Sequence, residues 1–157
     1  YVPELTRLQP ASEPDIDVLF YGAINIRRQQ VLRQLKATGM CVHAASGIYG
    51  RERDALIARA RLLLNVHFYE AKVLEMVRIT YLLANRRVVL SEHSADPAED
   101  DALAEGVAFA DYPDLARRAR ELIEAPEECE RLARRGFELI SARPAVEYLR
   151  PALAQYG

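Results

Sequence analysis

Short apolar runs alternate with segments of helical spacing along most of this chain, and that alternation constrains the fold more than any other feature. Residues 61–92 show it most clearly, because apolar runs at 62–66 and 88–90 flank a polar stretch and a helical segment. Neither run alternates strictly between polar and apolar side chains, which favours strands buried on both faces of a parallel sheet.

The same alternation extends to both sides of this central unit. Strands are predicted at 16–21, 40–45, 62–66, 88–90 and 107–110, and helices at 23–39, 51–60, 112–124, 127–140 and 146–154. Strands that alternate with helices of this length form right-handed crossover units. The sequence therefore predicts an α/β fold, a doubly wound, Rossmann-like parallel sheet of about five strands followed by C-terminal helices.

Residues 1–15 contain three prolines and no periodicity, so we expect a linker or interdomain segment before one domain at 16–157. The chain opens on Tyr1 rather than methionine, and we expect it to be a fragment of a longer protein.

Composition narrows the class of protein further. Half of the 157 residues are hydrophobic, 28% are charged and the net charge is −2, which fits an ordinary globular domain and indicates no nucleic-acid partner. Cys41 lies in an apolar run and Cys129 in a charged segment, which favours a reduced, cytoplasmic protein. No apolar run approaches the roughly 20 residues of a membrane span.

In a sheet of this kind, ligands bind in the loops that follow the strands. The first such loop has Gly22 at a strand end, followed by Arg27 and Arg28. A glycine there lets the backbone approach a phosphate, and the arginines offer charge-assisted hydrogen bonds. The loop lacks the dinucleotide and Walker fingerprints, so an ordinary turn with two solvated arginines remains an alternative.

A second loop is bounded by Gly47 and Gly50 and carries Tyr49 between them. It offers backbone groups to a base edge and an aromatic ring for stacking, although a simple connecting turn also fits this pattern.

The third loop, in the central unit, gathers the densest polar cluster. His67, Tyr69, Glu70, Lys72 and Glu75 follow a buried strand and run into a predicted helix start. A lone carboxylate at a helix start offsets the dipole, and a lone histidine is commonly a core residue. The cluster as a whole indicates a ligand site.

A fourth loop, Ser91-Glu92-His93-Ser94, indicates neither a metal site nor a hydrolase. No further histidine or cysteine spacing completes a metal-ligand set, and no nucleophile elbow is present.

The order of these features resembles the C-terminal, nucleotide-sugar-binding domain of GT-B glycosyltransferases. The segment from Val73-Leu74-Glu75-Met76 to Val88-Val89-Leu90-Ser91 is similar to a family segment that binds the donor, and the likeness covers residues 16–150.

The resemblance implies a role for each site residue. Glu75 would hydrogen-bond the ribose hydroxyls, and the backbone at Val73 and Leu74 would present N–H groups to the diphosphate. Positive charge would come from Arg27, Arg28 or Lys72, while the turn with Gly47 and Tyr49 would border the base and Gly22 would lie beside the phosphates.

Two positions depart from the family pattern. Eight residues before Glu75, where many retaining members carry a glutamate that touches the donor sugar, this chain has His67, and Glu70 lies five residues before it. We therefore treat His67 and Glu70 as candidate donor-sugar contacts. Asn85 and Arg86 stand where the family has a glycine before the strand.

The resemblance implies a metal-independent hexosyltransferase of glycan biosynthesis, with no cofactor besides its nucleotide-sugar substrate. The acceptor would be held by an N-terminal domain that this chain lacks, so the fragment alone is expected to be inactive. Two alternatives remain: a non-catalytic or degenerate module that serves interaction or assembly, and a dinucleotide-dependent oxidoreductase, which the missing glycine fingerprint disfavours.

Overall fold

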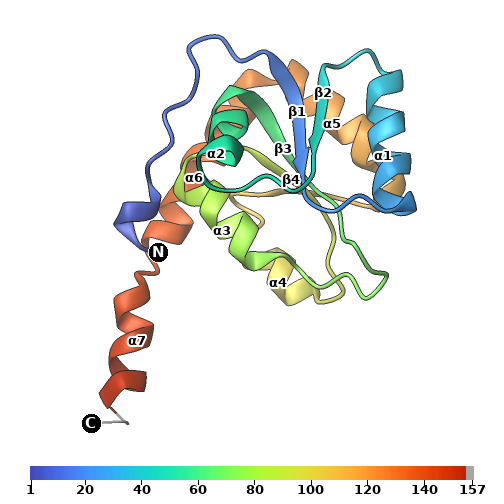
Figure 1. The fold of residues 1–157 in the computed structure, drawn as a ribbon. Helices are drawn as coiled ribbons and strands as arrows, with labels where there is room; N and C mark the ends of the chain where they lie inside the picture. The colour runs from blue at the N-terminus through green and yellow to red at the C-terminus, as the bar shows by residue number, and fades with distance from the viewer. Residues whose placement is uncertain (155–157) are drawn as a thin grey trace.

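The computed structural model describes residues 1–154, which form a five-stranded parallel sheet covered by helices on both faces (Figure 1). The sheet order is β2-β1-β3-β4-β5. The strands are β1 (Ile16–Tyr21), β2 (Val42–Ala45), β3 (Ala60–Asn65), β4 (Val89–Glu92) and β5 (Ala108–Ala110). This arrangement confirms the predicted doubly wound α/β fold.

The helices separate the strands in the predicted order. They are η1 (Pro3–Leu5), α1 (Ile26–Ala37), α2 (Gly50–Arg59), α3 (Met76–Ala84), α4 (Pro97–Asp101), η2 (Tyr112–Asp114), α5 (Leu115–Glu124), α6 (Pro126–Ser141) and α7 (Ala145–Ala154). Helices α1 and α5 pack on one face of the sheet, and α2 and α3 pack on the other (Figure 1).

Strand β3 shows why the apolar runs are unbroken. Leu62 and Leu64 pack in the core beneath α1 and α5, while Leu63 between them packs beneath α2 and α3. Successive side chains of a strand point to opposite faces, so the part of a strand that is covered on both sides carries apolar residues at consecutive positions.

Several boundaries differ from the predicted ones. The strand predicted at 40–45 begins at Val42, which leaves Cys41 exposed just before it rather than inside it. The strand predicted at 88–90 is Val89–Glu92, so it extends to a polar residue. Helix α3 begins at Met76, after the residues 71–74 that the sequence placed at its N-terminus, and the chain turns before it, with Lys72 at φ 48°. Helix α4 lies in the polar stretch for which no element was predicted.

Two glycines let the loop before β5 touch α6. A Cβ on Gly106 would lie 2.3 Å from the Cα of Gly136, and one on Gly136 would lie 2.6 Å from the side chain of Leu83 on α3. Only glycine at both positions permits this approach, which fixes α6 against the sheet.

Hydrogen bonds hold the N-terminal segment, residues 1–15, against the domain. The buried side-chain amide of Asn85 donates to the carbonyl of Leu5 and accepts from the backbone N–H groups of Arg7 and Leu8, at 2.8–2.9 Å. The predicted linker segment therefore packs along α3 in this structure.

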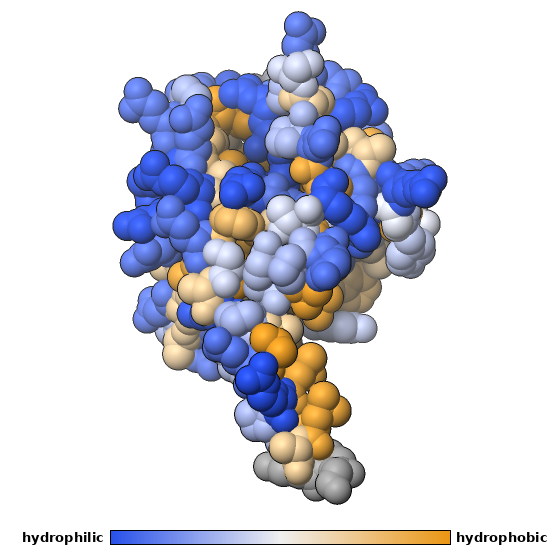
Figure 2. Space-filling view, turned by 90° about the vertical axis from the view of Figure 1, so that its left-hand side faces the viewer, coloured by the Kyte–Doolittle hydropathy of each residue, from blue (hydrophilic) through white to orange (hydrophobic). Residues whose placement is uncertain are grey.

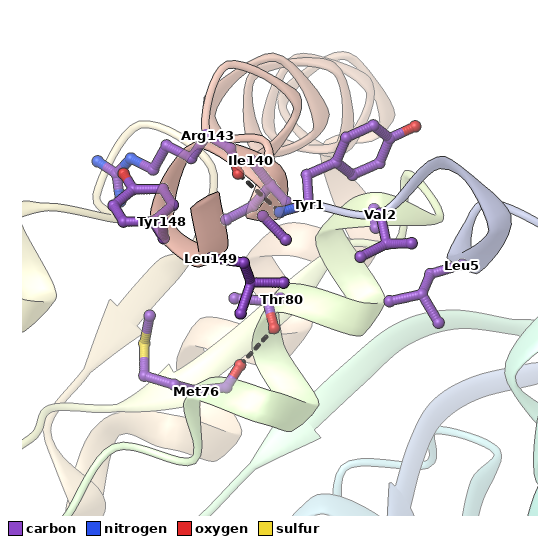
Figure 3. Close-up of a pocket in the computed structure, with 11 residues that line it drawn as sticks. Tyr1, Val2, Leu5, Met76, Thr80, Ile140, Arg143, Tyr148 and Leu149 are labelled. Carbon is purple, nitrogen blue, oxygen red and sulfur yellow. Dashed lines mark hydrogen bonds between the residues drawn. The ribbon is translucent and has the colours of Figure 1, made fainter. Parts of the chain in front are cut away.

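The N-terminus lies at the base of the last described helix, α7, beside an apolar surface (Figure 1). The N-terminal ammonium group of Tyr1 donates to the carbonyl of Arg143, and the backbone N–H of Ala145, the first residue of α7, donates to the carbonyl of Tyr1. Helix α7 projects from the domain with exposed apolar side chains along one side, including Leu149 and Leu153 (Figure 2). A groove of about 390 Å³ lies at its base, where Val2, Leu149 and residues of α3 face one another (Figure 3). None of the described helices is long and apolar enough to cross a membrane.

Candidate functional site

The connections of the sheet reverse direction between β1 and β3. The chain passes from β1 outward to β2, then returns to the other side of β1 to form β3, β4 and β5. In open parallel sheets, the crevice at the carboxyl ends of two such strands is where ligands bind. A cleft of about 740 Å³ lies here, lined by Tyr21 at the end of β1, by Glu75 and Arg78 around the start of α3, and by Arg7 and Arg53.

Glu75 is positioned by the start of α3. It is the N-cap residue of the helix, and its carbonyl accepts the first backbone hydrogen bonds, from Arg78 and Ile79. One carboxylate oxygen lies 2.5 Å from Arg28 and the other 2.7 Å from Arg78. The side chain is 27% exposed, so each oxygen retains a lone pair for a ligand hydroxyl.

Arg28, predicted as a phosphate contact, is instead almost entirely buried, with 3% of its surface exposed. It donates to the carbonyls of Val66 and Ala23 at 2.8 and 2.9 Å and to Glu75. Burial lowers the pKa of its guanidinium, and Glu75 acts in the opposite direction. Arg28 therefore ties the end of β3, the loop after β1 and Glu75 together.

The space beside Gly22, where the sequence predicted a phosphate, is filled by the side chain of Arg78. The φ of Gly22 is +137°, and a Cβ there would lie 2.9 Å from Nη2 of Arg78. The same guanidinium lies over the ring of Tyr21, 4.9 Å from its centroid. Arg78 was not among the sequence-predicted site residues, because its position within an amphipathic helix resembles an ordinary solvated charge.

Arg27 pairs with a carboxylate that the sequence reasoning did not use. Both terminal nitrogens of Arg27 contact Glu92 at the end of β4, whose side chain is fully buried. Lys72 lies 3.7 Å from the same carboxylate. The hydrogen bond that Arg27 donates to Glu92 raises the pKa of Arg27, and burial opposes it. The signal for Glu92 was present in the sequence, as an acid two positions after the apolar run 88–90.

His67 lies in this second cluster and not in the cleft. Its backbone N–H donates to the Glu92 carboxylate at 3.2 Å, and its ring Nε2 lies 3.2 Å from the Glu92 carbonyl. The ring is buried, and its Nδ1 has no partner among residues 1–154. Glu70 lies nearby, exposed, in a separate hollow of about 620 Å³ that Arg27 and Tyr112 also line.

The remaining predicted residues differ in exposure, and of Val73, Leu74, Gly47 and Tyr49 only Leu74 lines the cleft. Val73 is exposed, whereas the side chain of Leu74 is buried in the core and only its backbone is a candidate contact. Gly47 is in the left-handed region at φ 72°, and the ring of Tyr49 is 79% exposed after β2. Arg78 thus lies against both Gly22 and Glu75, and Arg28 also contacts Glu75. Arg27 and Lys72 lie beside Glu92 instead.

A second group of charges borders the cleft and was not predicted from the sequence. Asp54 on α2 accepts hydrogen bonds from Arg7, from Arg53 and from the hydroxyl of Tyr81, the last at 2.8 Å. Burial alone would raise the pKa of Asp54, but the bonds from Arg53 and Tyr81 outweigh it and lower that pKa. Arg7 belongs to the segment predicted as a linker, which supplied no signal for a site.

Two further properties limit the chemistry of the cleft. Burial raises the pKa of Tyr21 to about 12, so its hydroxyl stays protonated at neutral pH. No group of three or more metal-ligating side chains occurs among residues 1–154. The cleft therefore offers a carboxylate, guanidinium groups and backbone to a ligand.

The chain is similar to several solved structures, glycosyltransferases among them. TarM superposes with a TM-score of 0.70 at 10% identity, over 96% of this chain and 36% of its own. HepE of Anabaena, crystallised with UDP and glucose, gives 0.70 at 13% identity, over 99% of this chain and 54% of its own. The C-terminal domain of the group 1 glycosyltransferase LpcC from Francisella tularensis gives 0.64 at 11% identity, over 91% and 97%.

These superpositions confirm that the chain has the fold of the C-terminal domain of GT-B glycosyltransferases. No protein-family model matches the chain. Two uncharacterized proteins of Acanthamoeba polyphaga mimivirus are 26% and 29% identical to it over 122 and 107 residues, and the chain spans 17% and 12% of their lengths.

Proposed function

We propose that this chain is the donor-binding domain of a glycosyltransferase that uses a nucleoside diphosphate sugar. The observation that carries the proposal is the position of Glu75. Its partly exposed carboxylate lies at the start of α3, beside Arg78, in a cleft at the switch point of a GT-B-like sheet.

In this proposal Glu75 accepts hydrogen bonds from the ribose hydroxyls, since a carboxylate paired with arginine still has free lone pairs. The base lies toward the turn with Gly47 and Tyr49, where an exposed ring is available for stacking. The start of α3 and the arginines of the cleft stabilise the departing diphosphate, as preorganised positive charge does for developing negative charge.

The acceptor belongs to a separate domain in this proposal. HepE and TarM each contain more chain than the part that superposes here, 54% and 36% of their lengths being covered. The apolar groove beside α7 borders the cleft, because Leu5, Met76 and Thr80 line both hollows. We propose that the additional domain packs on this groove and the apolar side of α7.

Calorimetry tests the donor site. UDP, GDP, ADP, dTDP and their sugars are titrated at millimolar concentration into the wild-type chain and into Glu75→Gln, with Glu130→Gln on the exposed side of α6 as the matched control. We expect at least one nucleotide to bind and Glu75→Gln alone to weaken it. The absence of binding to every nucleotide, or equal affinities in all three proteins, would refute the proposal.

A second candidate is a degenerate module that no longer binds a donor. The ion pairs within the protein favour a degenerate module, because Glu75 already contacts two arginines and Arg27 is paired with Glu92. The same titration separates the two candidates, since a degenerate module binds none of the nucleotides.

A further inference from the structure

We propose that Arg78, seated on Gly22, is the residue that binds the phosphate groups of the ligand in the switch-point cleft. This inference rests on the proposed donor site and assigns its phosphate contact to Arg78, a residue that the sequence did not single out beside Arg27, Arg28, Lys72 and the backbone at Val73 and Leu74.

The guanidinium of Arg78 lies where a phosphate is expected in such a sheet. It reaches from the first turn of α3 to the carboxyl end of β1, over the ring of Tyr21 and against the backbone of Gly22. Its Nη1 lies 3.3 Å from the side-chain oxygen of Asn65 at the end of β3. Arg78 therefore spans the two strand ends between which ligands bind.

Its hydrogen-bonding capacity is only partly used. Contacts with Glu75 and Asn65 both involve Nη1, so Nε and Nη2 donate to no residue within 1–154. Arg28, by contrast, uses all three of its nitrogens on protein oxygens, and Arg27 places both terminal nitrogens on Glu92. Arg78 is the guanidinium of this group that has a free edge for a bidentate phosphate contact.

The charge around the cleft also favours an anion. Arg7, Arg53 and Arg78 line it together with Glu75, and Asp54 pairs with the first two. These groups leave one positive charge in excess, and the buried Arg28 behind Glu75 adds another. A ligand with two or more negative charges fits this balance better than a neutral one.

The contact between Arg78 and Gly22 allows the position of the guanidinium to be tested without changing Arg78 itself. A methyl group at Gly22 would meet Nη2 of Arg78 at 2.9 Å, and the φ of +137° is strained for any other residue. Gly22→Ala is therefore expected to displace the guanidinium while leaving its charge in the chain.

The test is a calorimetric comparison of inorganic pyrophosphate, the four nucleoside diphosphates and the corresponding nucleosides. We expect Arg78→Gln to weaken pyrophosphate and the diphosphates by about 10- to 100-fold, the usual effect of losing hydrogen bonds between charged groups. Affinity for the nucleosides should not change. Gly22→Ala should produce a loss in the same direction, and Arg33→Gln on the exposed side of α1 serves as the charge-matched control. Thermal unfolding of each variant verifies that it is folded.

The outcomes separate this inference from the proposed function. If the diphosphates bind and Arg78→Gln binds them as the wild type does, the role of Arg78 is wrong and the donor site stands. If pyrophosphate binds through Arg78 but no nucleotide binds, the phosphate contact stands and the donor site is wrong. If nothing binds, both are overturned.

Discussion

Replacing Glu92 with glutamine removes the most deeply buried negative charge at the carboxyl edge of the sheet. The Glu92 side chain has no exposed surface, and it accepts from Arg27, from the backbone N–H of His67 and, at 3.7 Å, faces Lys72. Glutamine has nearly the same shape, so Glu92→Gln changes the charge and leaves the packing in place.

The expected loss of stability follows from what the substitution leaves behind. Removing one partner of a buried ion pair costs about 3–5 kcal/mol, because the other charge remains without compensation. Arg27 is 20% exposed and packs on the ring of Tyr112 at 4.1 Å, so water and the ring offset part of this loss. We expect about 3 kcal/mol, which corresponds to a fall in Tm of about 6–12 °C for a chain of this size.

Urea unfolding followed by circular dichroism measures the free energy of unfolding. The matched control is Asp15→Asn, which removes the carboxylate of the exposed pair with Arg59, where the two side chains are 57% and 49% exposed. The control should change stability by at most about 1 kcal/mol. If Glu92→Gln lowers the free energy of unfolding by no more than the control does, the argument that burial strengthens the contribution of this ion pair is refuted.

The double variant provides an internal check on the mechanism. Arg27→Gln combined with Glu92→Gln removes both charges, so the double variant should be less destabilised than the sum of the single variants. Strict additivity would show that the two side chains act independently, contrary to their contact in the structure.

Three further predictions concern the elements that frame the site. Asn85→Ala should expose the segment 1–15 to limited proteolysis, since the amide of Asn85 holds that segment at three backbone groups, and an unchanged digestion pattern would contradict this role. Gly136→Ala should destabilise the chain by about 1–3 kcal/mol in urea unfolding, because its methyl group would meet Leu83 at 2.6 Å, whereas Glu130→Ala on the exposed side of α6 should not. The pKa of Asp54 is lowered in the folded state, so its contribution to stability is present above the unfolded pKa of about 3.9 and is lost as the pH falls below it. Asp54→Asn should therefore flatten the acid side of the stability profile between about pH 5 and 2, and a parallel profile would contradict this assignment.

The sequence by itself determined the sheet and its order of elements. Consecutive apolar residues such as Leu62, Leu63 and Leu64 favour strands covered on both faces, and the helical segments between the strands favour parallel crossover connections. The position of Glu75 at a strand-to-helix junction followed from the same local pattern. Local rules were less reliable at element boundaries, where the turn at Lys72 delays the start of α3 to Met76.

Only the tertiary structure decided which charges face the cleft and which are neutralised inside the protein. Arg27 and Arg28 are adjacent in sequence and the sequence pattern did not distinguish them. In the structure Arg27 pairs with Glu92, whereas Arg28 pairs with Glu75. Arg78 reaches Gly22 across 56 positions of the chain. The partner of an arginine depends on which strand ends are neighbours in the sheet, and no local pattern records that. The physical reason is that a buried charge must find its counter-charge in space, whereas sequence periodicity reports only burial.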